Sequence, residues 1–318
     1  MGDAGGRRVR LNICRSQRGM LARIMDVTLI VNPYASEVTQ ERVQAVEREL
    51  ARGAEVTTLL TERPGHGVEL AAGAGDADAI VVFSGDGGFN EALNGLAADV
   101  PIGFLPGGRT SVLPRALGLP REPVEAARRL ADALAQGRSR TISLGRVNGR
   151  RFAFAAGVGF DAELIRRVDR LGRRDDGRRP GDLAFVVETA TFLGRRLGRF
   201  EPVLEIEGMG RAAFALVANT DPYTYAGPRP IHVAPEAQFE LGLDVVAPAR
   251  VTPRALPRLV RYILRGGGEV GDLLYGHDLD RIDVRCDRPL PLQADGEDLG
   301  DVSAALFEAE RSAVRVLI

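Results

Sequence analysis

Short apolar runs rich in β-branched residues alternate with amphipathic stretches as far as Gln136. Strand-length runs that alternate with helix-length segments through short connections are typical of a parallel sheet covered by helices. The predicted strands are residues 26–32, 55–60, 78–83 and 101–105. The predicted helices are residues 39–52, 67–74, 89–97, 111–117 and 123–136. The first part of the chain is therefore predicted to be an α/β domain.

The pattern changes after Gly137. Residues 142–157 hold an Asn-Gly pair at Asn148 between two alternating runs, which is a strong hairpin signal, and residues 203–219 repeat the pattern around a second glycine turn. Further short strands are predicted at residues 231–234, 242–247, 281–287, 290–295 and 313–318. The second part of the chain is therefore predicted to be mostly antiparallel β structure.

Two helical inserts interrupt this β pattern, at residues 182–197 and 253–264. The second has clear ends, because Thr252 is a good N-cap, Pro253 suits a first helical position and Gly266 favours a stop. The patterns divide the chain into four parts. We expect a disordered extension (1–24), an α/β domain (25–138), a β-rich domain (139–310) and a last strand that returns to the first domain (311–318).

The composition supports globular domains and excludes several kinds of chemistry. With 318 residues, 45% of them apolar, the chain can bury a core in each of two domains. Its 42 basic and 43 acidic residues nearly cancel, so we expect no nucleic-acid partner. Every basic residue is arginine, which excludes a phosphate-binding lysine, a Schiff base and a lysine general base.

Cysteine and histidine usage fits a protein of the cytoplasm. Cys14 and Cys286 are far apart, and the three histidines lack the spacing of metal ligands. No apolar run approaches the roughly 20 residues that a membrane-spanning helix needs. We therefore expect a cytoplasmic protein that crosses no membrane.

Two glycine-rich turns carry the main candidate chemistry. Residues 84–88 (SGDGG) lie between a predicted strand and a predicted helix, where bare backbone N–H groups and a helix N-terminus attract phosphate. Taken alone, such a turn also suits packing without a ligand. Residues 107–111 (GGRTS) repeat the arrangement after the next strand, and Asn32 and Thr61 follow the first two strands. Since the carboxyl ends of parallel strands meet at one edge, these four segments are predicted to share one crevice.

These residues resemble the motifs of the diacylglycerol kinase-like lipid kinases, a family that includes sphingosine and ceramide kinases. Residues 84–96 (SGDGGFNEALNGL) are similar to the family's GGDGTxNEVxNGL, and residues 103–120 (GFLPGGRTSVLPRALGLP) to its GxxPxGTxNDFARxLGxP. The likeness runs from about residue 27 to the C-terminus. It includes Val31-Asn32-Pro33, residues 157–161 (GVGFD), Tyr225-Ala226-Gly227, Ala234-Pro235, Gly242-Leu243-Asp244 and residues 293–297 (QADGE).

The resemblance implies ATP-dependent phosphoryl transfer to a lipid hydroxyl on a diacylglycerol-like or sphingoid-like acceptor. It implies a phosphofructokinase-like α/β domain followed by a β-sandwich domain, with the site between them. Asp295 would be the general base, Asp86 a second catalytic residue, and Asp86 and Glu297 the ligands of a catalytic Mg²⁺. The residues expected to bind ATP are Asn32, Thr61, Ser84, Gly85, Asp86, Gly87, Gly88, Asn90, Glu91, Gly107, Gly108, Arg109, Thr110, Ser111 and Glu297.

The chemistry of phosphoryl transfer supports the same assignment. It needs a phosphate cradle, a metal held by carboxylates and a group that accepts the proton of the nucleophile. Asp295 and Glu297 flank Gly296 and supply two carboxylates beside bare backbone. Taken alone this is an ordinary turn, but two phosphate-binding turns upstream favour catalysis. A structural magnesium is also expected at Asp244, the one firm match to a metal-binding loop of some bacterial members.

Several positions depart from the family's pattern. Ser84 replaces the first glycine of the first motif, and Gly88 replaces its threonine. In the second motif, Arg109, Ser111 and Val112 replace threonine, asparagine and aspartate. We expect Arg109 to lie near the nucleotide phosphates, since a guanidinium can neutralise their charge in a protein without lysine. The alternative is that Arg109 points into solvent.

The helix predicted from Pro253 has one apolar face and one basic stripe. The stripe consists of Arg254, Arg258, Arg261 and Arg265, at spacings of three and four residues. Together with the arginine-rich segment 166–199, it indicates a peripheral surface that binds anionic headgroups at the inner face of the membrane. A core-facing helix with a solvated outer face is the alternative. The sequence leaves open whether the protein forms a homodimer.

Two other functions stay open. NAD kinases share a GGDG turn, but Asn32-Pro33, the second glycine turn and the Asp-Gly-Glu sequence suit lipid kinases better. A catalytically weak homologue that binds nucleotide or lipid is the third candidate, because the two motifs have lost a threonine, an asparagine and an aspartate. The product made from ATP separates the three.

Overall fold

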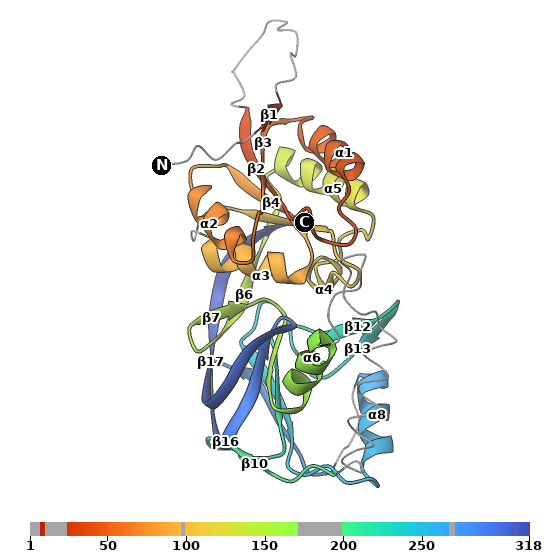
Figure 1. Ribbon diagram of the computed structural model, residues 1–318, viewed down its shortest axis with the longest axis vertical. Coiled ribbons are helices and arrows are strands. Elements are labelled where there is room, and N and C mark those ends of the chain that lie inside the picture. The colour runs from red at the N-terminus through yellow and green to blue at the C-terminus, as the bar shows by residue number, and fades with distance from the viewer. Residues whose placement is uncertain (1–6, 10–23, 97–98, 171–198, 267–270) are drawn as a thin grey trace, which may run out of the picture. The chain divides into compact units, whose positions relative to one another are not determined.

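The computed structural model describes residues 7–9, 24–96, 99–170, 199–266 and 271–318 (Figure 1). The described residues fall into two compact units. Unit 1 contains the residues up to Ile142 together with Val314–Ile318, and unit 2 contains Ser143–Ala313. The end of the chain therefore belongs to the same unit as its beginning.

Unit 1 is built on a parallel sheet. Its central strands are β2 (Met25–Val31), β3 (Ala54–Leu60), β4 (Ala79–Ser84) and β5 (Ile102–Pro106). The strand order is β1-β3-β2-β4-β5-β17, with β1 (Arg7–Val9) antiparallel to β3 and the end of β17 (Glu297–Leu317) parallel to β5. All of β4 is buried, as expected for a parallel strand with helices on both faces. The predicted parallel α/β architecture is confirmed.

Five helices accompany this sheet among the described residues. They are α1 (Gln40–Leu50), α2 (His66–Gly73), α3 (Asp86–Gly95), α4 (Val112–Ala116) and α5 (Pro123–Ala135). The α1 helix packs on α5, and α2 packs on α3. Figure 1 shows the two pairs on opposite sides of the sheet. Capping explains where α1 begins, because the Thr39 side chain accepts a hydrogen bond from the Arg42 backbone N–H.

Two local features of unit 1 differ from the sequence prediction. The α3 helix begins at Asp86 rather than Phe89, so two glycines lie in its first turn. The sequence pattern missed this turn because its glycines interrupt the apolar periodicity. Glycines are tolerated there because the N–H groups of a first turn have no partners inside the helix, so side chains contribute little to its formation. Residues Arg7–Val9 form a strand on β3, although the extension was expected to be disordered.

Unit 2 is built on antiparallel strand pairs. The order is β17-β16-β8-β11-β14-β15, and β9 pairs with both β10 and β16. The bounds are β6 (Ser139–Val147), β7 (Arg150–Phe152), β8 (Ala155–Val158), β9 (Leu204–Ile206), β10 (Gly210–Ala212), β11 (Ala215–Ala218), β12 (Thr224–Ala226), β13 (Arg229–Ile231), β14 (Leu243–Pro248), β15 (Leu273–Leu279) and β16 (Arg281–Ala294). The mostly antiparallel prediction is confirmed.

Unit 2 also contains α6 (Phe160–Arg170) and α8 (Leu256–Arg265). The sequence did not predict α6. The α8 helix starts at Leu256 rather than Pro253, because Thr252 closes a turn by accepting from the Ala255 N–H. Gly266 ends α8 in a left-handed conformation, as its sequence suggested. The predicted insert 182–197 and most of the arginine-rich segment lie outside the described residues.

The crossing of α2 and α3 depends on Gly95. A Cβ at this position would lie 2.0 Å from the Val68 carbonyl oxygen. We expect Gly95→Ala to force the helices apart and to lower the free energy of unfolding by roughly 1–3 kcal/mol. Gly73 is the matched control, because a Cβ there meets nothing within 4 Å. Urea unfolding should show Gly73→Ala to be neutral or up to about 1 kcal/mol more stable. Equal midpoints for the two variants would contradict this account.

Candidate functional site

The carboxyl ends of the four central strands lie at one edge of unit 1. The β2 strand pairs in parallel with β3 and β4, and β4 pairs in parallel with β5. Asn32, Thr61, Gly85 and Gly107 directly follow these strands, and the Asn32 N–H donates to the Phe83 carbonyl oxygen at 3.0 Å. Unit 1 therefore brings the four predicted segments to the edge where open α/β sheets bind ligands.

The two glycine-rich turns contact each other through bare backbone. The Gly107 N–H donates to the Ser84 carbonyl oxygen at 2.7 Å. A Cβ on Gly108 would lie 2.9 Å from the Gly85 Cα, and a Cβ on Gly107 would lie 2.9 Å from the Ser84 carbonyl oxygen. Side chains at these glycines would therefore separate the turns. The result is a surface of unshielded peptide groups, which suits phosphate.

The N-terminus of α3 opens on this surface. Gly85 is its N-cap and supplies no side-chain hydrogen bond to the first turn. N–H groups in a helix's first turn, together with the helix dipole, attract anions. Asp86 occupies the first helical position, and its Oδ1 accepts from the Leu113 N–H at 3.2 Å. Asp86 thus joins the first turn of α3 to the start of α4.

The second turn is held by Ser111. Its hydroxyl accepts from the Gly108 N–H at 3.2 Å and donates to the Gly108 carbonyl oxygen at 2.8 Å. Ser111 is buried and has a φ of 45°, a left-handed conformation that asparagine adopts more readily than serine. Arg109 is exposed beside it, and Thr110 is partly buried. The exposed Arg109 can meet a ligand without losing a buried partner.

Two predicted asparagines have clear local roles. The Asn32 Oδ1 accepts from the Tyr34 N–H at 3.0 Å and shapes the turn after β2. Asn90 is buried, and its Oδ1 and carbonyl oxygen accept from the Asn94 side chain at 3.2 and 2.9 Å. These hydrogen bonds give a local structural reason for asparagine at both positions.

The structure gives Glu91 a different role from the predicted one. Its Oε1 accepts from the Gly65 N–H and its Oε2 from the Gly67 N–H, each at 2.9 Å. Gly65, the N-cap of α2, has no side chain that could accept hydrogen bonds from the first N–H groups of the helix. The Glu91 carboxylate, from α3, accepts them instead. Glu91 therefore connects two helices, which no local sequence signal indicates.

In unit 2, Asp295 and Gly296 form the two-residue turn between β16 and β17. Both have positive φ, 48° and 79°, as a tight hairpin turn requires. Asp295 is 4% exposed, and its carboxylate accepts from three consecutive backbone N–H groups. The donors are Ala153 (2.7 Å), Phe154 (3.0 Å) and Ala155 (3.2 Å). The fold therefore fixes the orientation of this carboxylate.

A buried polar network that the sequence did not assign supports the same turn. The Gln293 amide donates to the Asp161 Oδ2 at 2.8 Å and to the Tyr223 hydroxyl at 3.0 Å, while its Oε1 accepts from the Gly296 N–H at 3.0 Å. The Tyr223 hydroxyl donates to the Asp161 Oδ2 at 2.6 Å. Burial raises the pKa of Asp161, and the hydrogen bonds from Tyr223 and Gln293 oppose that rise. The one sequence signal for a role of Asp161 and Gln293 was that both lie in motifs shared with the resembling family.

The predicted metal ligands of unit 2 have protein partners. The Glu297 Oε2 pairs with Arg150 at 2.6 Å, and the Glu297 side chain is 44% exposed. Within the described ranges, no group of three or more His, Cys, Asp or Glu side chains is arranged to hold a metal ion. A nucleotide-bound Mg²⁺ does not require such a group, because phosphates and water supply most of its ligands.

Asp244 does not fit a structural magnesium site. It is fully buried, and its carboxylate accepts from the Tyr275 hydroxyl at 2.8 Å and the Asp278 N–H at 3.1 Å. The His277 Nδ1 lies 2.9 Å from it, and this contact raises the pKa of His277. Donors surround Asp244, whereas a cation requires acceptors. The predicted metal role of Asp244 is therefore not supported.

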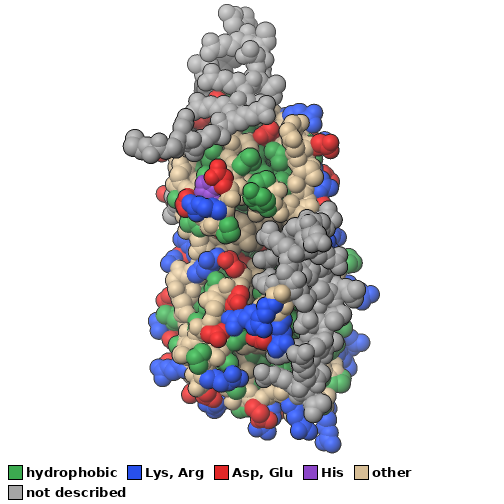
Figure 2. All heavy atoms as spheres, in the orientation of Figure 1, with side chains coloured by type: hydrophobic (Ala, Val, Ile, Leu, Met, Phe, Trp, Pro, Cys, Tyr) green, Lys and Arg blue, Asp and Glu red, His purple; other side chains and the backbone are tan. Residues whose placement is uncertain are grey.

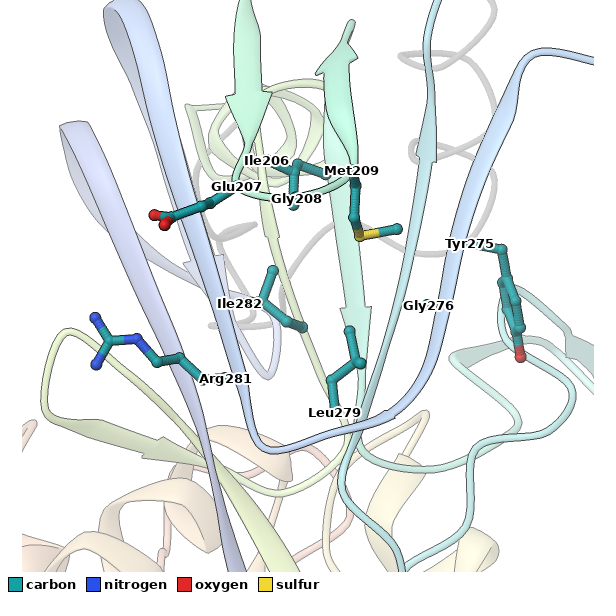
Figure 3. A pocket seen from close by; sticks show the side chains of 9 residues that line it. All are labelled: Ile206, Glu207, Gly208, Met209, Tyr275, Gly276, Leu279, Arg281 and Ile282. Atoms are coloured by element: carbon teal, nitrogen blue, oxygen red, sulfur yellow. The ribbon is translucent and has the colours of Figure 1, made fainter.

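A separate pocket of about 260 Å³ opens in unit 2 beside the turn between β9 and β10 (Figure 3). Ile206, Met209, Leu279 and Ile282 form its apolar lining, and Glu207 and Arg281 contribute charged side chains. None of the predicted site residues lines it. The pocket is thus distinct from the glycine turns and from the Asp295 turn.

Known proteins are similar to the part of this chain that contains both glycine turns. The model of the diacylglycerol kinase catalytic domain matches residues 26–147. A diacylglycerol kinase of Bacillus subtilis is 35% identical over 43% of this chain and 46% of its own length, so the chain spans about half of that relative. "Probable lipid kinase YegS-like" of Pseudomonas aeruginosa is 28% identical over 86% of this chain and 88% of its own length.

Solved structures extend the likeness to the whole fold. A diacylglycerol kinase from Bacillus anthracis superposes with a TM-score of 0.68 at 18% identity, over 93% of this chain and 98% of that one. An NAD kinase from Archaeoglobus fulgidus in complex with ATP superposes with a TM-score of 0.52 at 16% identity, over 92% and 93%. At these identities, both likenesses concern the fold alone.

The role of Glu91 as a cap of α2 can be tested by measuring the stability of a Glu91 variant. Glu91→Gln places an amide N–H₂ group against one of two N–H donors, so we expect the free energy of unfolding to fall by about 1–2 kcal/mol. Glu69→Gln is the matched control, because it removes the same charge from an exposed ion pair on α2. Thermal unfolding of both variants measures the difference. An unchanged midpoint in Glu91→Gln would refute the cap role.

Proposed function

We propose that this chain is a lipid kinase of the diacylglycerol kinase-like family, which its similarity to named members supports, and that it transfers the γ-phosphate of ATP to a lipid hydroxyl. The observation that carries this proposal is the contact between the two glycine turns at the carboxyl edge of the sheet. Both turns lie within the residues matched by the catalytic-domain model. The proposed acceptor is a diacylglycerol-like or sphingoid-like alcohol.

The glycine turns form the nucleotide half of the proposed site. Side chains at Gly107 and Gly108 would separate the two turns, whose bare backbone suits phosphate, so the residues present fit a nucleotide. The first-turn N–H groups of α3 would bind phosphate oxygens. Asn32 and Thr61 would line the nucleotide at the ends of β2 and β3. Arg109, exposed on the second turn, would neutralise phosphate charge.

Two carboxylates would hold the magnesium that accompanies ATP. A Mg²⁺ ion held by these residues would supply neutralisation of the phosphate charge, which favours attack on the γ-phosphorus. Asp86 lies in the first turn of α3, where the phosphates would bind. Glu297 would exchange its exposed ion pair with Arg150 for the metal, which costs little because exposed pairs are weak.

Asp295 is the proposed general base, which takes the proton of the acceptor hydroxyl. Its three backbone donors orient the carboxylate independently of any substrate. The buried Gln293 network holds the neighbouring Gly296 N–H. A base that is already oriented needs no rearrangement when the hydroxyl arrives.

The base role predicts a selective loss of turnover in Asp295→Asn. Purified protein would be incubated with labelled ATP, magnesium and a total lipid extract, and the labelled product identified. We expect kcat to fall by about 10²- to 10⁴-fold while ATP binding persists. Asp278→Asn is the matched control, because Asp278 also has positive φ and accepts a backbone N–H, from Gly242. Both variants would be assayed below their measured unfolding midpoints.

One result would contradict the base role of Asp295, and two others would contradict the proposed reaction. Equal turnover in Asp295→Asn and Asp278→Asn would show that Asp295 is not the general base. Transfer of label to NAD would identify an NAD kinase. Binding of ATP without any labelled product from the wild-type protein would indicate a binding homologue without kinase activity.

We also propose that α8 docks unit 2 on anionic lipid at the cytoplasmic face of a membrane. Val260 and Leu264, one turn apart, are 49% and 56% exposed. Four exposed arginines of α8 and its N-terminal flank lie among them: Arg254, Arg258, Arg261 and Arg265. The buried Tyr262 anchors the helix by donating to the Val233 carbonyl oxygen at 2.9 Å. Exposed apolar and basic groups together suit a headgroup surface.

Basic and acidic side chains are interspersed on the face seen in Figure 2. Among the described residues, no helix has the length and apolar character needed to cross a membrane. The α8 docking proposal therefore rests on its own exposed side chains.

Vesicle sedimentation tests the docking proposal. We expect Arg258→Ala/Arg261→Ala to bind phosphatidylglycerol vesicles roughly 30-fold more weakly, since each arginine near an anionic surface contributes about 1 kcal/mol. Arg52→Ala/Arg285→Ala, at positions 66% and 81% exposed, removes the same charge elsewhere and should bind like wild type. Added salt should weaken wild-type binding. Equal effects of the two double variants would count against α8.

A further inference from the structure

Ser84 and Gly88 compete for one small volume between the end of β4 and the first turn of α3. A Cβ on Gly88 would lie 2.1 Å from the Ser84 Oγ and 2.7 Å from the Ser84 Cβ. Atoms at these separations overlap strongly, so the two positions cannot both carry a side chain in this arrangement. The Ser84 hydroxyl therefore stands where the side chain of residue 88 would begin.

The Ser84 hydroxyl is buried and lacks a hydrogen-bond partner. Ser84 is 1% exposed, and its Oγ has no partner among the described residues. A buried hydroxyl without a partner destabilises a protein, so its retention calls for a functional explanation. The hydroxyl adjoins the N-terminus of α3, which attracts anions. Donation to an anion would supply the missing partner.

We propose that Ser84 and Gly88 are a compensating pair, in which Ser84 supplies a phosphate-binding hydroxyl and Gly88 leaves the space that this hydroxyl needs. The identification of the ligand as a nucleotide phosphate rests on the proposed function. The resembling motif has glycine at the first position and threonine at the fifth. This chain has serine at the first and glycine at the fifth. The two departures are thus one exchange that keeps a hydroxyl in the loop.

The geometry also indicates how the hydroxyl reaches a ligand. The Ser84 backbone is fixed, because its carbonyl oxygen accepts from the Gly107 N–H at 2.7 Å. The buried hydroxyl can therefore leave its position only by rotation about the Cα–Cβ bond. The bare Cα of Gly88 keeps the volume beside it open for that rotation.

Binding measurements on three variants test the pair: Ser84→Ala, Gly88→Thr and Ser84→Gly/Gly88→Thr. The probes are ATP, which tests the nucleotide, and tripolyphosphate, which tests phosphate recognition without the base. Calorimetry gives the dissociation constants, and thermal unfolding gives the stability of each variant. Ser143→Ala is the matched control, because Ser143 is a buried serine of unit 2 whose hydroxyl accepts from the Ser312 N–H.

We expect Ser84→Ala to bind ATP and tripolyphosphate about 10-fold more weakly while its unfolding midpoint stays equal or rises. A hydroxyl with a purely structural role would instead lower the midpoint. Ser143→Ala should lower the midpoint and leave both dissociation constants unchanged. Unchanged binding of tripolyphosphate by Ser84→Ala would overturn the proposal.

The exchange gives a second, independent test. Gly88→Thr alone should weaken ATP binding and lower the midpoint, because its side chain overlaps Ser84. The double variant Ser84→Gly/Gly88→Thr should recover both quantities toward wild type, beyond the sum of the single effects. A double variant no better than Gly88→Thr would overturn the pair.

Failure of the pair and failure of the proposed function give different results. If the variants bind as expected but the wild-type protein phosphorylates no lipid, the proposed reaction is wrong and the pair holds. If a lipid is phosphorylated but Ser84→Ala binds tripolyphosphate normally, the pair is wrong and the reaction holds. A wild-type protein that binds neither ATP nor tripolyphosphate would refute both.

Discussion

The backbone contact between the two glycine turns is the constraint on which the candidate site depends. The Gly107 N–H donates to the Ser84 carbonyl oxygen, and the Gly85 and Gly108 backbones approach so closely that Gly108 has no room for a Cβ. This contact brings the N-terminus of α3 beside the second turn, where Asp86 reaches the start of α4. A side chain at Gly107 or Gly108 would separate the two turns and the N–H groups that they present.

In both units, carboxylates are fixed by backbone N–H groups from distant parts of the chain. Glu91 accepts from the start of α2, and Asp295 accepts from the connection between β7 and β8 and from the first residue of β8. A charged acceptor shared by several N–H donors is strongly oriented. For Glu91 this orientation explains a structural role, whereas for Asp295 it prepares the carboxylate for the proposed proton transfer. Similar contacts thus serve different purposes.

Local signals predicted most of the architecture. Apolar runs located β2 to β5, the Asn-Gly pair located the hairpin of β6 and β7, and glycine clusters located both glycine-rich turns. The signals failed where tertiary contacts determine structure. Glycines hid the first turn of α3, and a backbone turn at Thr252 delayed the start of α8. The α6 helix went unpredicted, although its Asp161 belongs to the polar network under the Asp295 turn.

By itself, the amino-acid sequence determined an α/β unit, an antiparallel β unit, two glycine-rich turns and the family resemblance, because periodicity, turn residues and motifs are local properties. Only the tertiary structure decided that Glu91 caps α2, that donors surround Asp244 and that Ser84 occupies the space beside Gly88. The sequence records the serine and the glycine as separate departures from one motif. The structure joins them, because two side chains cannot fill the same volume.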